Sequence, residues 1–312
     1  MKGKFEHYFA EIMLFSTTLF WAGTFAIVKN SVQDCSPTIF VAIRFSIATI
    51  VLLPFIIPYL SELKVNLKSG FILGVTLCIG FLLQTTGLTL TSATKSGFIT
   101  GSLVVLTPFC EYFILKRKPG KGAIIGVTFV FVGLVFLSTK GNNVLNLFIE
   151  LGNDFNLGDL LTLLGALAYS IYIVFIDIYT SEKNSKILTF IQIFITAIVS
   201  YIVAGIFDIT NIEKISITWT TSLILSFLYT AIFATVLTTF LQTKYQNKVT
   251  PTEAGIIYSF EPIFAAVISY IFLGEILGYI AYLGALIVVV GIILAHLLPT
   301  TNKVMENAIF KD

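Results

Sequence analysis

Charged residues are scarce in this chain of 312 residues, because Asp, Glu, Lys and Arg together make up only 12% of it. Soluble domains carry about 25% charged residues. Hydrophobic residues reach 56% and the mean hydropathy is +0.94, which is more apolar side chain than a soluble fold can bury. Lipid is therefore the predicted solvent of most of the surface. The net charge is only +2 and no basic stripe alternates with aromatic residues, so a nucleic-acid partner is not expected.

Disulfide, metal and catalytic motifs are lacking as well. The three cysteines, Cys35, Cys78 and Cys110, show neither disulfide nor metal-ligand spacing. No GxxxxGK[ST], HExxH or GxSxG motif occurs, so neither an ATP-driven module nor a hydrolase is indicated. We expect no catalytic residue, no metal and no cofactor, and we do not expect an enzyme. The N-terminal segment has no A-x-A cleavage site before its apolar span, which favours a retained first span over a signal peptide.

Long apolar stretches are abundant. Ten of them are each about 20 residues long, which is enough to cross the ~30 Å hydrocarbon core of a bilayer as an α-helix. The predicted fold class is all-α, a polytopic membrane protein with ten transmembrane helices. The predicted spans are 9–28, 38–59, 69–89, 95–115, 120–139, 157–179, 187–207, 217–243, 251–273 and 279–298.

The first half of the sequence recurs in the second half. An offset of 148 residues relates Trp21 to Tyr169 and Arg44 to Gln192. Past the connections at 61–68 and 208–218 the offset becomes 158, and several residues then match identically: Gly97 with Gly255, Leu115 with Leu273, Gly126 with Gly284 and Gly133 with Gly291. An internal repeat of this length indicates one structural unit used twice. The predicted organisation is a first repeat at 9–139 with helices 1–5, a connecting loop at 140–156, and a second repeat at 157–298 with helices 6–10.

The distribution of lysine and arginine predicts the orientation. With the N-terminus in the cytoplasm, the inner segments hold fourteen Lys and Arg residues and the outer loops hold four. This asymmetry predicts cytoplasmic termini in an inner, or plasma, membrane. Because each half has an odd number of spans, the second half begins on the other side of the bilayer, so the two repeats are predicted to be inverted. Inverted repeats are typical of carriers that work by alternating access.

Polar residues recur at helical spacing on spans 1–4 and 6–9, as in the stripe Thr235, Thr239, Gln242 and Gln246 of span 8. We therefore predict that eight helices surround a polar cavity. The predicted substrate-binding residues on its wall are Trp21, Arg44, Gln84, Thr100, Tyr169, Gln242 and Tyr258. Individual polar side chains can equally serve as contacts between helices, and the aromatic ones as ordinary packing. Spans 5 and 10 have glycines seven apart instead, which predicts a buttress or a homodimer contact.

Glu261 is the deepest acid in the sequence. It lies about 14 Å into its span, near the middle of the bilayer, where an acid costs about 2.5–3.5 kcal/mol. Pro262 follows it and weakens the helix there. We predict that Glu261 is a coupling or substrate-sensing residue; the alternative is a structural partner for Arg44. Arg44 is itself interpreted as either an anion-binding residue or half of a structural ion pair.

Two other ionisable residues have simpler interpretations. Glu111 lies one turn from Lys116 and is expected to snorkel or to pair with it. Lys95 begins span 4 and is expected to be solvated.

The order of several short motifs resembles that of the EamA-type ten-helix carriers of the drug/metabolite transporter superfamily. The residues that carry the resemblance are Phe20–Thr24, Arg44–Phe45, Gln84–Leu88, Ser96–Gly101, Glu261–Pro262 and Leu273–Glu275. The resemblance implies an inner-membrane carrier, often an exporter of amino acids or other small metabolites, with a central cavity between the repeats. The first repeat has Lys116–Arg117 where the second has Gly274–Glu275, so the two halves are not chemically equivalent.

These observations predict a gradient-driven secondary transporter, an exporter of small metabolites such as amino acids or related compounds, that works by alternating access in the lipid bilayer. Proton coupling, substrate exchange and facilitated diffusion all remain open at this point. A channel or a non-transporting membrane protein is the alternative. An intramembrane lipid-modifying enzyme is a weaker one, because the acids occur singly and not as a cluster.

Overall fold

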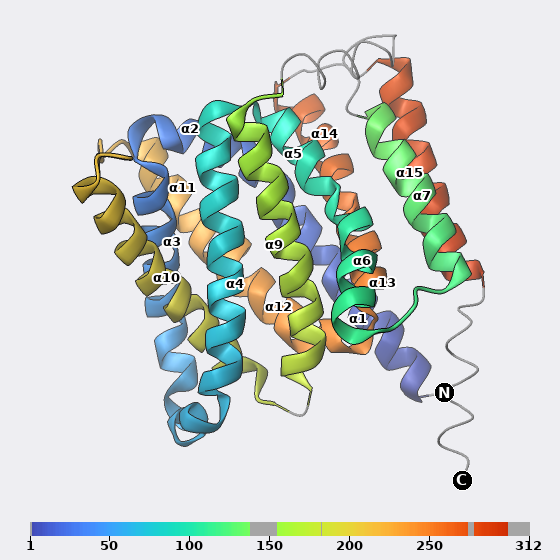
Figure 1. Cartoon of the computed structure of the whole chain (residues 1–312), viewed down its shortest axis with the longest axis horizontal. Coiled ribbons are helices and arrows are strands. Elements are labelled where there is room, and N and C mark those ends of the chain that lie inside the picture. The colour runs from blue at the N-terminus through green and yellow to red at the C-terminus, as the bar shows by residue number, and fades with distance from the viewer. Residues whose placement is uncertain (1, 138–154, 182, 274–277, 299–312) are drawn as a thin grey trace.

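The computed structural model describes residues 2–137, 155–181, 183–273 and 278–298, and in these ranges the chain is a bundle of helices with no strand longer than the isolated bridge between Cys35 and Ile217 (Figure 1). The first half contains α1 (Lys2–Ala22), α2 (Thr24–Asp34), α3 (Pro37–Ile56), η1 (Ile57–Glu62), α4 (Leu63–Leu90), α5 (Ala93–Gly101), α6 (Leu103–Leu115) and α7 (Lys121–Leu137). The second half contains α9 (Leu157–Thr180), α10 (Ser185–Ile209), α11 (Thr221–Ala231), η2 (Ile232–Leu237), α12 (Thr238–Tyr245), η3 (Gln246–Lys248), α13 (Pro251–Tyr258), α14 (Phe260–Leu273) and α15 (Tyr279–Leu297).

These elements form the ten predicted spans, so the all-α fold class is confirmed. Six stretches are long and apolar enough to cross a membrane, and one of them, Pro37–Leu90, has 54 residues because it contains both α3 and α4. α7 and α15 are shorter apolar helices. Four spans are interrupted: α1 and α2 meet at Gly23, α5 and α6 at Ser102, α13 and α14 at Ser259, and η2 is a π-helical turn between α11 and α12.

Equivalent helices of the two repeats run in opposite directions. In Figure 1, α1 rises from the end of the bundle where the N-terminus lies, whereas α9 descends toward that end. We call this the N-terminal end and the other one the opposite end. The backbone of Thr218, between α10 and α11, donates to the carbonyl of Asp34 at the opposite end. Lys186, which begins α10, donates to the hydroxyl of Tyr59 in η1 at the N-terminal end. The inverted arrangement agrees with the prediction from the odd number of spans in each half.

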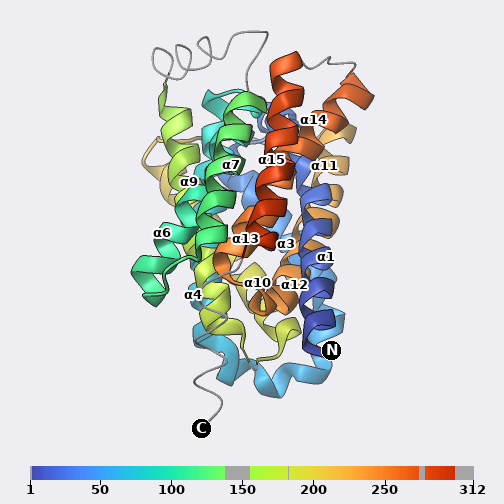
Figure 2. The same cartoon turned by 90° about the vertical axis from the view of Figure 1, so that its right-hand side faces the viewer.

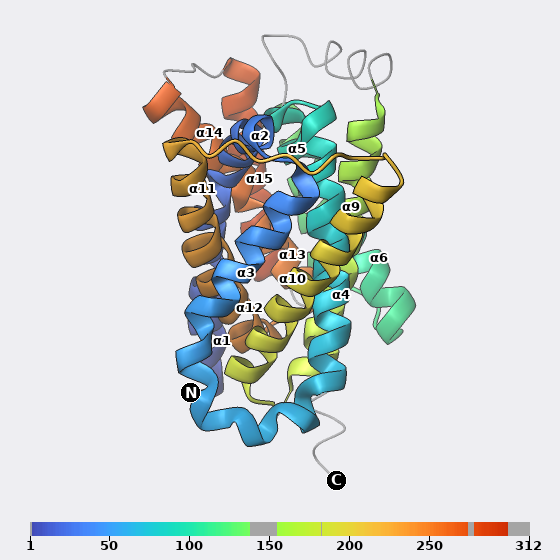
Figure 3. The same cartoon turned by 90° about the vertical axis from the view of Figure 1, so that its left-hand side faces the viewer.

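Helices of the first repeat pack closely against helices of the second repeat. α4 packs along both α9 and α10, and α3 packs along α10 (Figure 3). The main apolar core lies there and includes Phe45, Leu73 and Ile187, all fully buried. Gly80 makes the close approach of α4 and α9 possible, because a Cβ atom on it would lie 2.5 Å from the Cε1 atom of Tyr169. The two repeats therefore share one core.

α7 and α15 pack against each other beside the bundle (Figure 2). A Cβ atom on Gly126 would lie 2.5 Å from the Cβ atom of Ala295, and one on Gly133 would lie 2.7 Å from the carbonyl oxygen of Gly284. The glycines seven apart thus bring the last helix of each repeat together within one chain. A homodimer through these helices stays a prediction.

Candidate functional site: a cavity between the repeats

All eight predicted site residues line one cavity of about 80 Å³ in the middle of the bundle. They come from both repeats, and their elements are α1, α3, α4, α5, α9, α12, α13 and α14. The eight residues are Trp21, Arg44, Gln84, Thr100, Tyr169, Gln242, Tyr258 and Glu261. The cavity therefore gathers side chains that are far apart in the sequence.

The predicted number of cavity helices is wrong by one. Among the described residues, span 7, which is α10, contributes nothing to the lining, so seven spans form it. Gln192 on α10 is fully buried behind the wall, where it accepts from Tyr172 and donates to Thr243. Thr196 donates to the carbonyl of Gly74. The polar stripe of α10 joins helices together, which is the alternative that a repeating polar pattern always carries.

Breaks in the helices occur where the cavity residues lie. Pro262 has no N–H group, so the carbonyl of Tyr258 loses its partner four residues later in the helix. The chain turns at Ser259, between α13 and α14, and both Tyr258 and Glu261 line the cavity. In span 1, the break at Gly23 follows Trp21 by two residues. In membrane proteins, interrupted helices of this kind are tolerated where their backbone is buried in protein or lines a cavity.

Arg44 is held by the π-helical turn η2. Its Nε donates to Thr235 Oγ1 at 2.7 Å, and its NH2 group donates to the carbonyl of Ala234 at 2.9 Å. The guanidinium lies 4.7 Å from the centre of the Phe81 ring, a cation–π distance. Among the described residues no carboxylate lies within ion-pair distance of Arg44, so the alternative interpretation, in which Glu261 pairs with Arg44, is not observed. Arg44 is 3% exposed, and its positively charged group is solvated by neutral hydrogen-bond acceptors and by the face of an aromatic ring.

A second polar chain crosses the cavity between the repeats. The Tyr169 hydroxyl donates to Gln84 Oε1 at 3.2 Å, and Gln84 Nε2 donates to Thr100 Oγ1 at 2.9 Å. Trp21 packs edge-on against Tyr258, with 5.3 Å between ring centres, and its Nε1 donates to the carbonyl of Ala234. Most polar groups of the wall are therefore fixed in orientation.

Glu261 differs from the other wall residues, because its carboxyl group takes part in no hydrogen bond with any residue that the structure describes. Glu261 is partly exposed, and it is one of the residues that line the cavity. An acid placed in this way is available to a ligand or a proton in the cavity.

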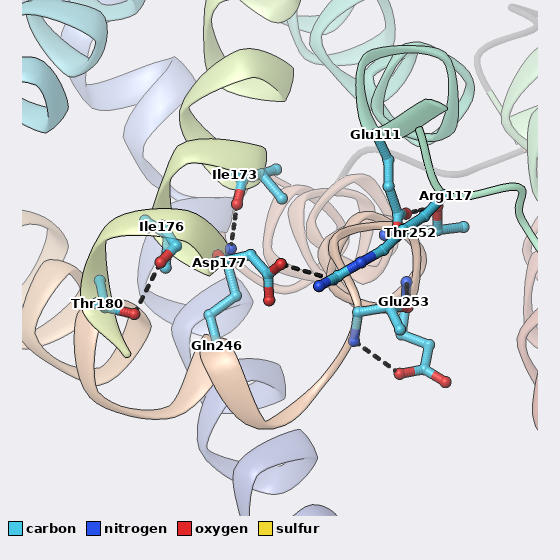
Figure 4. A network of polar contacts seen from close by, with 10 residues as sticks. Glu111, Arg117, Ile173, Ile176, Asp177, Thr180, Gln246, Thr252 and Glu253 are labelled. Atoms are coloured by element: carbon cyan, nitrogen blue, oxygen red, sulfur yellow. Dashed lines mark hydrogen bonds and ion pairs between the residues drawn. The ribbon is translucent and has the colours of Figure 1, made fainter. Parts of the chain in front are cut away.

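A buried glutamine beside the cavity forms hydrogen bonds with two residues of the cavity wall. Gln246 in η3 is 1% exposed and accepts from both Tyr258 and Gln242, and it donates to the carbonyl of Ile173 at 2.7 Å (Figure 4). These bonds connect α9, α12, η3 and α13. We refer to Gln242, Gln246 and Tyr258 as the polar seal.

Glu111, near the polar seal, has a different partner from the one predicted. Glu111 does not pair with Lys116; it accepts from the backbone and hydroxyl of Thr252, at the start of α13 (Figure 4). Arg117, which follows, pairs with Asp177 on α9 at 2.9 Å. Both contacts fasten the last residues of span 4 to the second repeat, at the N-terminal end of the bundle.

At the opposite end of the bundle, the environment of Lys95 also differs from the one predicted. Lys95 is not simply solvated, because its Nζ lies 2.6 Å from the fully buried carboxylate of Asp159. Thr91 donates to the same carboxylate at 2.6 Å. An ion pair therefore joins α5 to α9 at that end.

Sequence reasoning missed Phe81 and Ala234. Phe81 lies three residues before Gln84 on the same face of α4, but an aromatic residue in an apolar span has no signal of its own. Ala234 acts through its backbone carbonyl, which the sequence does not distinguish. Gln246 and Thr235 belonged to the polar stripe of span 8 and could be found in that way.

Comparisons with known proteins give a consistent result. The model of the EamA-like transporter family matches the chain twice, over residues 8–139 and 156–297. An uncharacterized transporter of Archaeoglobus fulgidus is 34% identical over 289 residues, which cover 93% of this chain and 86% of that protein. The uncharacterized transporter YyaM of Bacillus subtilis is 26% identical, with 97% of this chain and 100% of that protein covered. A solved crystal structure has the same fold, with a TM-score of 0.74 at 15% identity over 92% of this chain and 96% of the other.

Proposed function

Because this chain belongs to the EamA-like transporter family, we propose that it is a secondary transporter that exports a small amphipathic metabolite by alternating access. One observation carries the proposal: polar and aromatic side chains of both repeats meet in one cavity, beside breaks in their helices. Such a site at a repeat interface is what a carrier needs, because each repeat can move relative to the other around a fixed ligand.

The charges of the cavity suggest the substrate class. Arg44 uses two of its N–H groups on neutral acceptors, which leaves donors for a carboxylate or another anionic group. Glu261 provides an acceptor for an ammonium group. Between them the wall offers the rings of Trp21, Phe81 and Tyr258 for an apolar portion. A zwitterion with a small apolar side chain, such as an amino acid or a related compound, fits these three features.

The polar seal supports the alternating-access part of the proposal. It closes the N-terminal end of the cavity with hydrogen bonds that are easily exchanged for water, and not with a continuous apolar core. In the orientation predicted from lysine and arginine, this end faces the cytoplasm and the protein lies in the inner membrane. The substrate would then enter the cavity when the polar seal opens and leave from the opposite end.

Glu261 is the proposed coupling residue. A proton on its carboxyl group would compete with the ammonium group of the substrate, which links the two ligands at one position. The test is efflux of a radiolabelled amino-acid mixture from proteoliposomes, with and without a pH gradient, for the wild type and for Glu261→Gln. We expect the gradient to accelerate efflux only in the wild type. An equal response of the two proteins would remove Glu261 from coupling, and efflux insensitive to the gradient in both would favour exchange or facilitated diffusion.

The same vesicles separate a carrier from a channel. Unlabelled substrate on the far side accelerates the efflux of labelled substrate through a carrier, because the loaded site returns faster than the empty one. A channel shows no such counterflow and no saturation with substrate. We expect saturation and counterflow, and their joint absence would contradict the proposed mechanism.

A further inference from the structure

The contact of α1 with α13 at the N-terminal end corresponds, through the internal repeat, to the contact of α5 with α9 at the opposite end. Ser96 and Thr162 share a hydrogen bond at the α5–α9 contact. The two sequence offsets convert these residues into Ala254 and Leu14, which belong to one apolar cluster at the α1–α13 contact. The two contacts are therefore equivalent in position as well as in sequence.

The charges at the equivalent positions differ. At the opposite end, Lys95 and Asp159 form an ion pair with 2.6 Å between Nζ and Oδ2. The same offsets relate Lys95 to Glu253 and Asp159 to Glu11. The contact at the N-terminal end thus brings two carboxylates to positions where its counterpart has a cation and an anion. Like charges at such positions repel unless a cation accompanies them.

His7 is in position to supply that cation. It lies on α1 one turn before Glu11, and its Nε2 is 2.9 Å from Glu11 Oε1. Its Nδ1 is 2.9 Å from the carbonyl oxygen of Lys248 in η3. A neutral imidazole has one N–H group and can donate to only one of these two acceptors, whereas the protonated ring donates to both. The negative charge of Glu253 also acts on the ring.

We propose that His7, Glu11 and the carbonyl of Lys248 form a proton-dependent fastening that holds α1 to the segment before α13. With a proton on both ring nitrogens, the fastening joins α1 to η3. When one proton leaves, a ring nitrogen with a lone pair faces an acceptor, and the positive charge 2.9 Å from Glu11 is lost. η3 contains both Lys248 and Gln246, so a shift of η3 also loosens the polar seal.

The surrounding charges leave His7 as the group that responds near neutral pH. Among the side chains that the structure describes, the other charged or titratable groups on α1 and on the elements packed against it are Glu6, Tyr8 and Glu11 on α1, Lys29 and Asp34 on α2 at the opposite end, Lys244 and Tyr245 on α12, Lys248 on η3, Glu253 on α13, and Tyr258 and Glu261 at the cavity. Lys248 Nζ is 3.6 Å from Glu6, and Lys244 Nζ lies 5.0 Å from the centre of the Tyr245 ring. At the N-terminal end, histidine is the residue type whose charge ordinarily changes between pH 6 and 8.

The consequence for transport rests on the proposed function: acid at the N-terminal end keeps the cavity closed there, and alkali releases it. The fastening itself can be tested without a substrate. Spin labels are attached to Ile12→Cys on α1 and Phe113→Cys on α6, after the three native cysteines have been replaced by serine. Both positions are well exposed, and α6 packs against α13. The distance between the labels is measured by pulsed electron resonance on the full chain in nanodiscs at pH 6 and pH 8.

We expect the distance distribution to move to longer values from pH 6 to pH 8 in the wild-type background. His7→Gln should give the longer distances at both pH values, and His7→Lys, which keeps a cation, the shorter ones at both. His296→Gln, which changes the only other histidine of the chain, should respond like the wild type. Thermal unfolding of the purified protein should show the same pattern, with Tm lower by about 2–4 °C in His7→Gln at pH 6.

The proposal is overturned if the distances in the wild-type background do not depend on pH, or if His7→Gln responds to pH as the wild type does. Neither result would affect the efflux experiment with Glu261→Gln, since the two tests share no variant and no substrate. Conversely, a protein that moved no amino acid could still show the pH-dependent distance. Failure of the fastening and failure of the proposed transport are therefore separate outcomes.

Discussion

Arg44 and Thr235 belong to opposite repeats, and the 2.7 Å hydrogen bond from Arg44 Nε to Thr235 Oγ1 fastens α3 to the π-helical turn of η2. Thr235 Oγ1 also donates to the carbonyl of Thr230, five residues back, which is the spacing of a π-turn. One hydroxyl thus stabilises an unusual turn and orients the buried cation of the cavity. π-turns often occur at functional sites.

Thr235→Val should weaken this arrangement, because valine keeps the shape of threonine and removes the acceptor of a buried charged donor. The loss of such a hydrogen bond costs about 1.5–3 kcal/mol of the free energy of unfolding. We expect thermal unfolding at a lower temperature and weaker binding of an anionic ligand. Thr235→Ser keeps the hydroxyl and is the control, so it should stay close to the wild type. Equal unfolding temperatures for the valine and serine variants would show that the bond does not hold Arg44.

Glu111, near the last residue of span 4, makes a comparable contact at the N-terminal end of the bundle. Its carboxylate accepts from the backbone N–H of Thr252, which belongs to the first turn of α13 and has no acceptor within that helix. Glu111→Ala should leave this N–H unpaired in a buried position and lower the free energy of unfolding by about 1–3 kcal/mol. Glu111→Gln keeps an acceptor oxygen and should cost less. Denaturation followed by circular dichroism measures both, and an alanine variant as stable as the glutamine variant would contradict this role.

The residues of the cavity show what a sequence can reveal. The spacing of polar residues predicted the positions of Gln84 and Gln242, because a polar side chain in an apolar span is costly and is retained where it meets a cavity or another helix. The internal repeat added strength to this inference, since the two glutamines are equivalent at an offset of 158. Helical periodicity placed each of them on the polar face of its helix.

The remaining features depend on contacts between distant segments. Gln192 has the same chemistry as Gln84, but the neighbour of α10 on its polar face is Tyr172 and not the cavity. The sequence predicts that Glu111 pairs with Lys116, about one turn away, whereas its partner in the structure is Thr252, 141 residues later. A sequence pattern gives the face of a helix and not the identity of the helix that packs against it. The π-turn of η2 likewise has no signal in the sequence.

Cys35 offers a test of the opposite end of the bundle. Its thiol is 2% exposed in the connection between α2 and α3, next to the bridge with Ile217. Burial, with the nearby charges of Glu213 and Asp34, raises the pKa of the Cys35 thiol to about 12. At pH 8 the folded protein therefore holds almost no thiolate, while an unfolded cysteine with a pKa of about 8.5 is partly ionised. A protein with Cys78 and Cys110 replaced by serine should react slowly with a maleimide and rapidly after denaturation.

The same raised pKa has a consequence for stability. Because the folded state keeps the thiol neutral up to about pH 12 and the unfolded chain ionises it from about pH 8.5, the contribution of Cys35 is fully present below pH 8.5 and is lost as the pH rises toward 12. Cys35→Ser should show a smaller fall of stability between pH 8 and pH 10 than the wild type. Parallel curves for the two proteins would mean that the thiol ionises as easily in the folded state.

Gly74 provides the sharpest test of the packing between the repeats. A Cβ atom at this position would lie 2.8 Å from the backbone carbonyl oxygen of Gln192 and 3.0 Å from its Cα atom, so relief requires α4 and α10 to separate. Overpacking of this kind costs about 1–3 kcal/mol. Gly205→Ala on α10 is the matched control, because nothing lies within 4 Å of its added Cβ atom and alanine is the better helix former. We expect Gly74→Ala to lower Tm and Gly205→Ala to leave it unchanged or raise it. If both variants unfold together with the wild type, the two repeats do not meet as closely at Gly74 as the structure shows.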